Sequence, residues 1–344
     1  MGESRRDSLE QVRAGRRLRA WSWLLLLAWL VTSCGTEPTP GASSDVALPS
    51  EDAGAQDAVD AGTDAGAADT GPDADAAISI DPLVPPASGY AAIFLDVGQG
   101  DATLIVASTG ETLLIDGGVS SSLLGKRLAR LGVTRIDMIV ATHADADHIT
   151  GLADVLADYE VGTIVWNGVK KGTQIFDDFL AAANAEPGAK VLIGRRGDTL
   201  TLGNLTLEVL HPGSGADTSD DHNNQSVVLQ TGCAGAWLLM PGDAEAPAET
   251  EMIGANVLSD VDVLHVAHHG SSSGTGTALL AKVQPEVAVI SAGAENAYGH
   301  PDADVIERLE GVGATIWRTD VGWDDDSLWM HADCKGGLQF GRVP

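Results

Sequence analysis

The stretch from Thr142 to His148 constrains the fold of this chain more than any other. It reads Thr-His-Ala-Asp-Ala-Asp-His and lies between an apolar run at 136–141 and a helix-like segment at 149–156. This pattern predicts a buried strand, a polar loop and a helix, and open α/β sheets place their sites at such strand ends. A polar turn in which Asp147 or Thr150 caps the helix is the alternative. It accounts for one polar residue rather than four, so we predict a divalent metal site.

Further polar residues follow two other apolar runs. Asp243 follows the run 237–240 and a glycine, where a carboxylate is well placed to bridge two metal ions, although it could also cap the next helix. His268 and His269 follow the run 261–267. These groups exceed what one structural zinc needs, and with Asp243 shared they match a two-metal hydrolytic site. His265, inside the last run, is interpreted as a core histidine.

Apolar segments of strand length recur from residue 91 to the end of the chain, with helix-like segments between them. The mixture of hairpins and helical crossovers favours an α/β protein with a mixed sheet system covered by helices. The expected strands are 91–97, 102–106, 112–116, 136–141, 161–166, 205–211, 226–230, 236–240, 261–267, 287–291 and 314–318, and the expected helices are 123–131, 174–183, 246–254, 277–283 and 303–311.

The N-terminal third differs in composition from the rest. Residues 1–33 carry six arginines before a short apolar run and are interpreted as an export signal. The run 30–34 resembles a lipobox, which predicts acylation of Cys34, with an ordinary secretory signal as the alternative. Residues 34–86 are rich in Ala, Asp, Gly and Pro and predict a disordered tether. Residues 87–344 then form one folded domain, lipid-anchored at the bacterial cell envelope and without a transmembrane channel.

Charge and cysteine content exclude several classes of protein. The formal net charge of -29 repels nucleic acid and anionic membranes, which counts against tight non-specific DNA binding. The folded part has only Cys233 and Cys334, so a four-thiolate zinc site is excluded. In an exported domain these two cysteines are candidates for a disulfide, but sequence alone does not establish the geometry. No nucleophile-elbow motif supports a serine hydrolase.

The motifs in this order resemble the metallo-β-lactamase superfamily, and within it the branch of the nuclease-like domain of ComEC-type competence proteins. The resemblance covers nearly all of residues 88–344. It rests on 143–148 and on Leu95-Asp96-Val97-Gly98-Gln99-Gly100-Asp101-Ala102, Leu114-Ile115-Asp116-Gly117-Gly118, Asn223-Asn224-Gln225-Ser226, Gly242-Asp243, His268-His269-Gly270-Ser271, Tyr298-Gly299-His300-Pro301 and Arg318-Thr319-Asp320. It implies an αββα sandwich, in which two mixed β-sheets are flanked by helices and the metal site lies at one edge.

The resemblance also implies a set of site residues. The implied metal ligands are His143, Asp145, Asp147, His148, Asp243 and His269. His222 and Asn224 compete for the ligand position of the third motif. His268 is expected beside the metals or facing the substrate. Most of the superfamily has histidine where this chain has Asp145, and the additional oxygen makes manganese as plausible as zinc for the two ions.

The expected activity is hydrolysis by water that two metal ions activate. Asp147 is expected to orient the water or take its proton, and His300 to stabilise or protonate the leaving group. Asn223, Asn224, His268 and Ser271 are candidates for substrate contacts. A small-molecule or nucleic-acid phosphodiester is the first expectation for the substrate. The alternatives are a phosphorylcholine ester, a lactone or a β-lactam, or a surface domain that binds metal without catalysis.

Overall fold

The computed structural model describes residues 12–13, 81–214, 221–322, 325 and 327–343. Cys34 and most of the predicted signal and tether therefore lie outside the described residues. The described exceptions are Val12–Arg13 (β1) and the segment 81–86. In that segment the carbonyl of Pro82 accepts a hydrogen bond of 3.2 Å from Nε2 of His331. Residues assigned to the end of the tether thus contact the folded domain.

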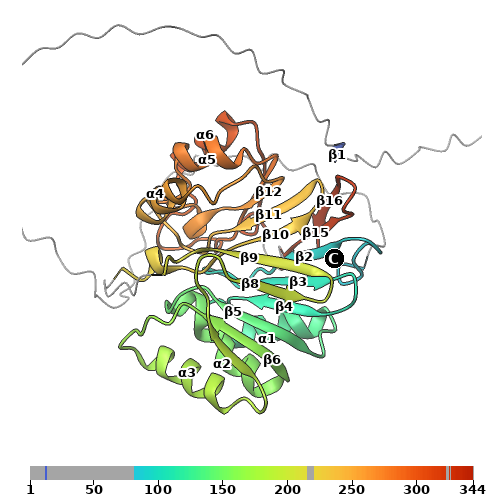
Figure 1. Cartoon of the computed structure of the whole chain (residues 1–344), viewed down its shortest axis with the longest axis vertical. Helices are drawn as coiled ribbons and strands as arrows, with labels where there is room; N and C mark the ends of the chain where they lie inside the picture. The colour runs from blue at the N-terminus through green and yellow to red at the C-terminus, as the bar shows by residue number, and fades with distance from the viewer. Residues whose placement is uncertain (1–11, 14–80, 215–220, 323–324, 326, 344) are drawn as a thin grey trace, which may run out of the picture. The chain divides into compact units, whose positions relative to one another are not determined.

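Two mixed sheets make up the centre of the described structure (Figure 1). The first runs in the order β1, β16 (Gly337–Arg342), β15 (Leu328–Ala332), β2 (Tyr90–Phe94), β3 (Thr103–Ala107), β4 (Thr112–Ile115), β5 (Ile136–Ala141), β6 (Val161–Trp166) and β7 (Lys190–Ile193). The second runs β14 (Thr315–Arg318), β13 (Val287–Ile290), β12 (Val263–His265), β11 (Ala236–Met240), β10 (Val228–Cys233), β9 (Leu205–His211) and β8 (Thr199–Leu202). Within the first sheet, neighbouring strands from β4 to β7 pair in parallel. Within the second sheet, neighbouring strands from β11 to β14 do the same.

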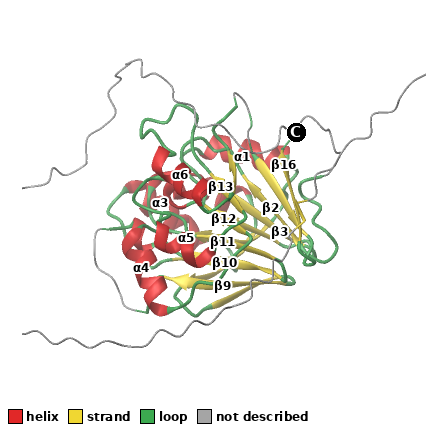
Figure 2. Ribbon diagram, turned by 90° about the horizontal axis from the view of Figure 1, so that it is seen from above, coloured by secondary structure: helices red, strands yellow, loops and turns green. Residues whose placement is uncertain are grey.

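Helices cover the outer face of each sheet (Figure 2). The first sheet packs against α1 (Ser121–Arg130), α2 (Ala146–Asp158) and α3 (Gln174–Ala185), and the second against α4 (Ala246–Ala255), α5 (Thr277–Val283) and α6 (Ala303–Gly311). Two short 3-10 turns, η1 (Asn223–Gln225) and η2 (Ala267–Gly270), interrupt the loops at the sheet edge. The four layers confirm the predicted αββα sandwich.

The long apolar runs follow from this layering. Along β2, Tyr90 and Phe94 face the core between the two sheets, whereas Ala91 and Ile93 face the helices. A strand that is buried on both faces has no solvent side, so its sequence shows a continuous apolar run rather than alternation. The same reason accounts for the run that precedes the polar stretch at 142–148, because β5 lies inside the first sheet.

Five of the described strands were absent from the sequence prediction: β1, which lies in the predicted export signal, and β7, β8, β15 and β16. Strand β7 lies at an edge of the first sheet, and all four of its residues are exposed, so no buried pattern marks it. Strands β8, β15 and β16 are short or carry polar residues and glycine, such as His331 and Gly341. These strands are fixed by pairing with neighbours rather than by their own sequence pattern.

The two cysteines of the folded part form a disulfide. Cys233 ends β10 in the second sheet, and Cys334 lies in the turn between β15 and β16 of the first sheet. The bond joins residues that are 101 positions apart. It therefore links the two layers and restricts a long loop of the unfolded chain.

Reduction of this disulfide should lower the free energy of unfolding by about 2–4 kcal/mol, because the unfolded chain regains the entropy of a long loop. Urea denaturation with and without a thiol reductant measures the difference. The double variant C233S/C334S should match the reduced wild type and show no response to reductant. Equal stability of the oxidised and reduced protein would contradict the assignment.

Candidate metal centre

Three loops bring the predicted ligands together at one edge of the sandwich. The loop after β5 carries His143 and leads into α2 with His148, the loop after β11 carries Asp243, and η2 after β12 carries His269. A hydrogen bond of 2.9 Å from the backbone of Val227 to that of Thr142 joins the two sheets at this edge. The site is thus formed by strand ends from both sheets.

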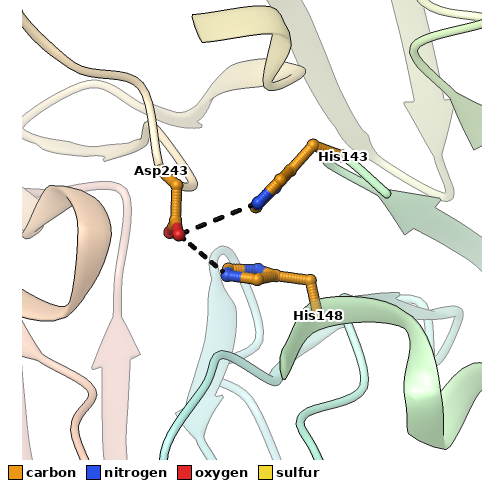
Figure 3. Close-up of side chains that lie close together, drawn as sticks. All are labelled: His143, His148 and Asp243. Carbon is orange, nitrogen blue, oxygen red and sulfur yellow. Dashed lines mark ion pairs between the residues drawn. The ribbon is translucent and has the colours of Figure 1, made fainter. Parts of the chain in front are cut away.

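Asp243 lies at the centre of this cluster. Its Oδ2 atom is 3.1 Å from Nε2 of His148 and 3.7 Å from Nε2 of His143 (Figure 3). The same oxygen is 3.6 Å from Nε2 of both His268 and His269. A single carboxylate is therefore within reach of four imidazoles, which is the position expected of a ligand shared by two ions.

Overlapping groups of ligand atoms meet in this cluster. His148 is shared by the group of His143, His148 and Asp243 and the group of Asp147, His148 and His269. Asp243 and His269 form a further group with Asp101. Nε2 of His269 lies 3.3 Å from Oδ2 of Asp147. Among the described residues His269, but not His268, belongs to such a group, which agrees with the preference for His269 as a ligand.

Asp145 lies at the outer side of the cluster. Its Oδ1 atom is 3.8 Å from Nε2 of His143 and 3.0 Å from the ammonium of Lys171, which follows β6. The carboxylates of Asp145 and Asp147 are both 28% exposed, whereas His143, His148 and His269 are buried. The oxygen ligands of this loop therefore face the solvent side, and the nitrogen ligands face the protein.

Asp116 orients His148 directly and His143 through Thr142. Its carboxylate accepts hydrogen bonds from the backbone N–H of Thr142 at 2.8 Å and from the Thr142 hydroxyl at 2.7 Å. It also lies 2.8 Å from Nδ1 of His148. The Thr142 oxygen in turn lies 3.0 Å from Nδ1 of His143. Because Nδ1 of each imidazole is engaged, Nε2 is left to bind a metal.

A second pair of contacts orients His269. Its Nδ1 lies 3.1 Å from the carbonyl of Ser291 and 3.2 Å from Oδ1 of Asp101. Asp101 is buried and also lies 3.7 Å from Nε2 of His265. His265 is buried as well, 2.9 Å from the hydroxyl of Ser291, in agreement with its interpretation as a core histidine.

Unusual backbone conformations support this arrangement. His268 and His269 have φ values of 49° and 54°, and Asp116 has 59°, in the left-handed region that side chains rarely adopt. Gly100 has φ +116°, and an added Cβ would lie 2.1 Å from the Asp147 carbonyl oxygen. Such conformations cost free energy and persist where the surrounding structure demands them. The backbone next to the side-chain cluster thus adopts conformations that are otherwise unfavourable.

The chemistry of these residues fits divalent metal ions. Nε2 of His143, His148 and His269 and Oδ1 of Asp243 are buried side-chain atoms that lack a hydrogen-bond partner. Leaving such atoms unpartnered is costly, whereas a bound cation would satisfy them together. Three imidazole nitrogens and three carboxylates suit zinc or a harder ion such as manganese.

The electrostatics of the cluster favour positive charge. Burial disfavours an imidazolium at His148, but the carboxylates of Asp243 and Asp116 outweigh burial and hold its pKa well above the usual value. Burial likewise disfavours charge on Asp243, yet His148 and His269 hold the pKa of that carboxyl well below its usual value. Buried carboxylates that attract protons onto histidine attract a divalent cation for the same reason.

A cavity of about 160 Å³ opens beside the cluster. Of the predicted residues, Asn223, His268 and His300 line it together with Asp145, Asp147, Asp243 and His269. The hydroxyl of Ser271 instead lies 2.9 Å from that of Ser273. Gln99 and Tyr298 also line the cavity; both belong to motifs noted in the sequence, but no role was expected for them.

The two candidates for the third-motif position differ in their surroundings. His222 precedes η1, and no ligand group of the described residues includes it. The side-chain Oδ1 of Asn224 accepts hydrogen bonds of 3.1 Å from the backbone N–H groups of Glu245 and Ala248. Asn224 therefore satisfies N–H groups at the start of α4, which gives its side chain a structural role in holding η1.

Sequence reasoning assigned no role to Asp116, Asp101, Glu245 or Lys171. The sequence does mark Asp116 and Asp101, because each lies next to a glycine in one of the motifs that resemble the family. Glu245 lies 3.0 Å from Nδ1 of His268, and this hydrogen bond lowers the pKa of its carboxyl. Lys171 and Glu245 lie in segments without a motif, so only the tertiary structure identifies them.

A family comparison agrees with this geometry. The model of the metallo-beta-lactamase superfamily matches residues 95–294, which is more than half of the chain. The chain belongs to the metallo-β-lactamase superfamily. Members of this superfamily are metal-dependent hydrolases, and the ligand cluster described above lies within the matched range.

Several competence proteins are similar to this metallo-β-lactamase domain. ComE operon protein 3 of Bacillus subtilis is 32% identical over 247 residues, which cover 66% of this chain and 31% of that protein. Competence protein ComA of Neisseria gonorrhoeae is 30% identical over 269 residues, covering 77% and 34%. The chain thus spans about a third of the length of these relatives. The resemblance to the ComEC-type branch is confirmed.

Among solved structures, the metallo-beta-lactamase fold protein YhfI of Bacillus subtilis aligns with a TM-score of 0.45 and 12% identity, covering 68% of this chain and 98% of that one. Within the described part of the metallo-β-lactamase domain, no helix is both long enough and apolar enough to cross a membrane.

Replacing Asp116 by Asn should weaken metal binding about 10- to 100-fold, because the His148 ring loses the carboxylate that orients it. Titration of the purified protein with Zn²⁺ or Mn²⁺ in competition with a chelator measures the affinity. D154N changes an exposed residue of the same helix as His148 and should bind metal as the wild type does. Unchanged affinity in D116N would contradict the orienting role.

Proposed function

We propose that this chain is a metal-dependent phosphodiesterase related to the nuclease-like domain of competence proteins. The observation that carries the proposal is the pair of ligand groups that share His148. Asp147, Asp243 and His269 of these groups also line one cavity. The names of the similar proteins, which include Recombination protein 2 of Haemophilus influenzae, support a phosphodiester substrate.

The ligands proposed for two divalent ions are His143, Asp145, Asp147, His148, Asp243 and His269. When bound, two such ions supply Lewis acidity and make a nearby water a stronger nucleophile at neutral pH. Asp147 is proposed to orient this water and accept its proton, since its carboxylate lines the cavity and is partly exposed.

His300 is proposed to act on the leaving group. Its ring lines the cavity beside His268, with ring centroids 5.8 Å apart. Burial lowers the pKa of His300, which favours a neutral imidazole near pH 7. A neutral imidazole can donate its N–H to the oxygen that gains charge as the ester bond breaks.

The charge around the cavity supports a small anionic substrate. Lys171 provides a cation beside Asp145 at the metal cluster, where a phosphate oxygen would be stabilised. A net charge of -29 opposes the approach of a long polyanion. A small phosphodiester is compatible with both observations.

Hydrolysis of bis(p-nitrophenyl) phosphate tests the proposal. The full chain, purified in mild detergent and loaded with Zn²⁺ or Mn²⁺, should hold two ions and release p-nitrophenol. D147A should lower kcat about 10²- to 10⁴-fold, because the group that takes the proton is lost. D154A removes an exposed carboxylate from the same helix and should remain active. Metal-loaded protein without turnover would refute the phosphodiesterase proposal.

We also propose that the chain is exported and anchored by a lipid on Cys34. The lipobox-like run at 30–34 supports the anchor, and the disulfide supports an oxidising compartment. In a bacterial host fed labelled palmitate, C34A should lose the label completely and leave the membrane fraction. C233S/C334S removes the other cysteines and should keep the label. Label retained by C34A would contradict the anchor.

A further inference from the structure

We propose that Tyr298 forms a subsite that stacks against the base of a nucleoside-bearing phosphodiester next to the metal cluster. This inference rests on the proposed phosphodiesterase activity and narrows its substrate class. It assigns a substrate-binding role to a residue outside the ligand set.

Tyr298 lies at the solvent end of a row of rings that begins at the metal cluster. His268 lies 3.6 Å from Asp243, and the ring centroids of His268 and His300 are 5.8 Å apart. The Tyr298 ring follows at another 5.8 Å from His300, nearly parallel to it at 11°. Tyr298 lines the same cavity as Asp243. A substrate with its phosphate at the cluster would therefore extend past His300 towards Tyr298.

The exposure of Tyr298 contrasts with that of its neighbours. The tyrosine side chain is 70% exposed, whereas Asp243 and His269 are almost completely buried. An exposed aromatic ring at the mouth of a cavity offers an open face to a flat ligand. Stacking on such a ring tolerates any base, because every nucleobase has a π-face.

The loop that carries Tyr298 is held in place without a ligand. The side-chain amide of Asn296 donates hydrogen bonds to the carbonyls of Gly293 and His300, at 2.9 and 2.6 Å. Its oxygen accepts hydrogen bonds from the backbone N–H groups of Tyr298 and His300, at 3.2 and 3.0 Å. Across the cavity, Gln99 accepts a hydrogen bond of 3.2 Å from the N–H of Gly293. A preformed loop avoids an ordering cost on binding.

The overall charge gives stacking a particular advantage here. A net charge of -29 repels every phosphate that approaches the domain. Contacts to an uncharged base are not weakened by this repulsion. They can therefore add binding affinity where charge repulsion lowers it. The favoured substrate is therefore a phosphodiester with a nucleoside on one side, rather than one with two small alkyl groups.

Two esters with the same leaving group isolate the contribution of the base. These are the p-nitrophenyl ester of thymidine 5′-monophosphate and methyl p-nitrophenyl phosphate. The full chain loaded with Mn²⁺ should show a higher kcat/KM for the thymidine ester. In Y298A the ratio of the two kcat/KM values should fall about 10-fold, mainly through KM, because one base stack is lost. Y298F keeps the ring and should preserve the ratio.

An unchanged ratio in Y298A would overturn the subsite. If the wild type hydrolyses neither ester, the phosphodiesterase proposal fails, and calorimetric binding of thymidine 5′-monophosphate and ribose 5-phosphate decides the subsite separately. Tighter binding of the thymidine compound by the wild type, lost in Y298A, would sustain the subsite. Equal binding of both compounds by the wild type would overturn it.

Discussion

The buried carboxylate of Asp116 is the constraint on which the arrangement of the metal cluster depends. It accepts two hydrogen bonds from Thr142 and contacts Nδ1 of His148. Through the Thr142 hydroxyl it also determines the ring orientation of His143. A charged group that is buried to this degree is stable only when it is fully hydrogen-bonded. One residue at the end of β4 therefore fixes two ligands that arrive from the loop after β5 and from α2.

The two sheets supply the rigidity that this constraint needs. Parallel strands β4 and β5 in one sheet and β11 and β12 in the other end at the same edge, so short loops deliver all the ligands. The strands are buried on both faces, and close packing allows little movement of the loops that they carry. Ligand positions that arise from a packed scaffold can be held close to the geometry that a metal requires.

The distribution of polar and charged groups explains how one edge of an acidic protein could act on anions. The carboxylates of Asp145, Asp147 and Asp243 line the cavity together with His269, and Lys171 adds a cation beside Asp145. Tyr298 and His300 extend the cavity wall with aromatic rings at its outer end. The site thus combines attraction at the reacting centre with uncharged contacts further out, within a domain whose net charge is strongly negative.

The sequence patterns by themselves determined the α/β class with helix-covered mixed sheets, the central strands and the stretch at 142–148, because buried strands and metal-ligand clusters leave local patterns. The αββα sandwich followed from the resemblance of the motifs to a known family. The sequence also placed Asp243 and His269 after apolar runs, although they lie about 100 residues or more from His143. Only the tertiary structure decided that Asp116 and Asp101 support the ligands, that Asn224 holds η1, that Lys171 pairs with Asp145, and that Tyr298 lines the cavity. Edge strand β7 likewise could not be predicted from the sequence pattern. The physical reason is the same in each case: these roles depend on partners distant in sequence, and no local periodicity records which partner will be met on folding.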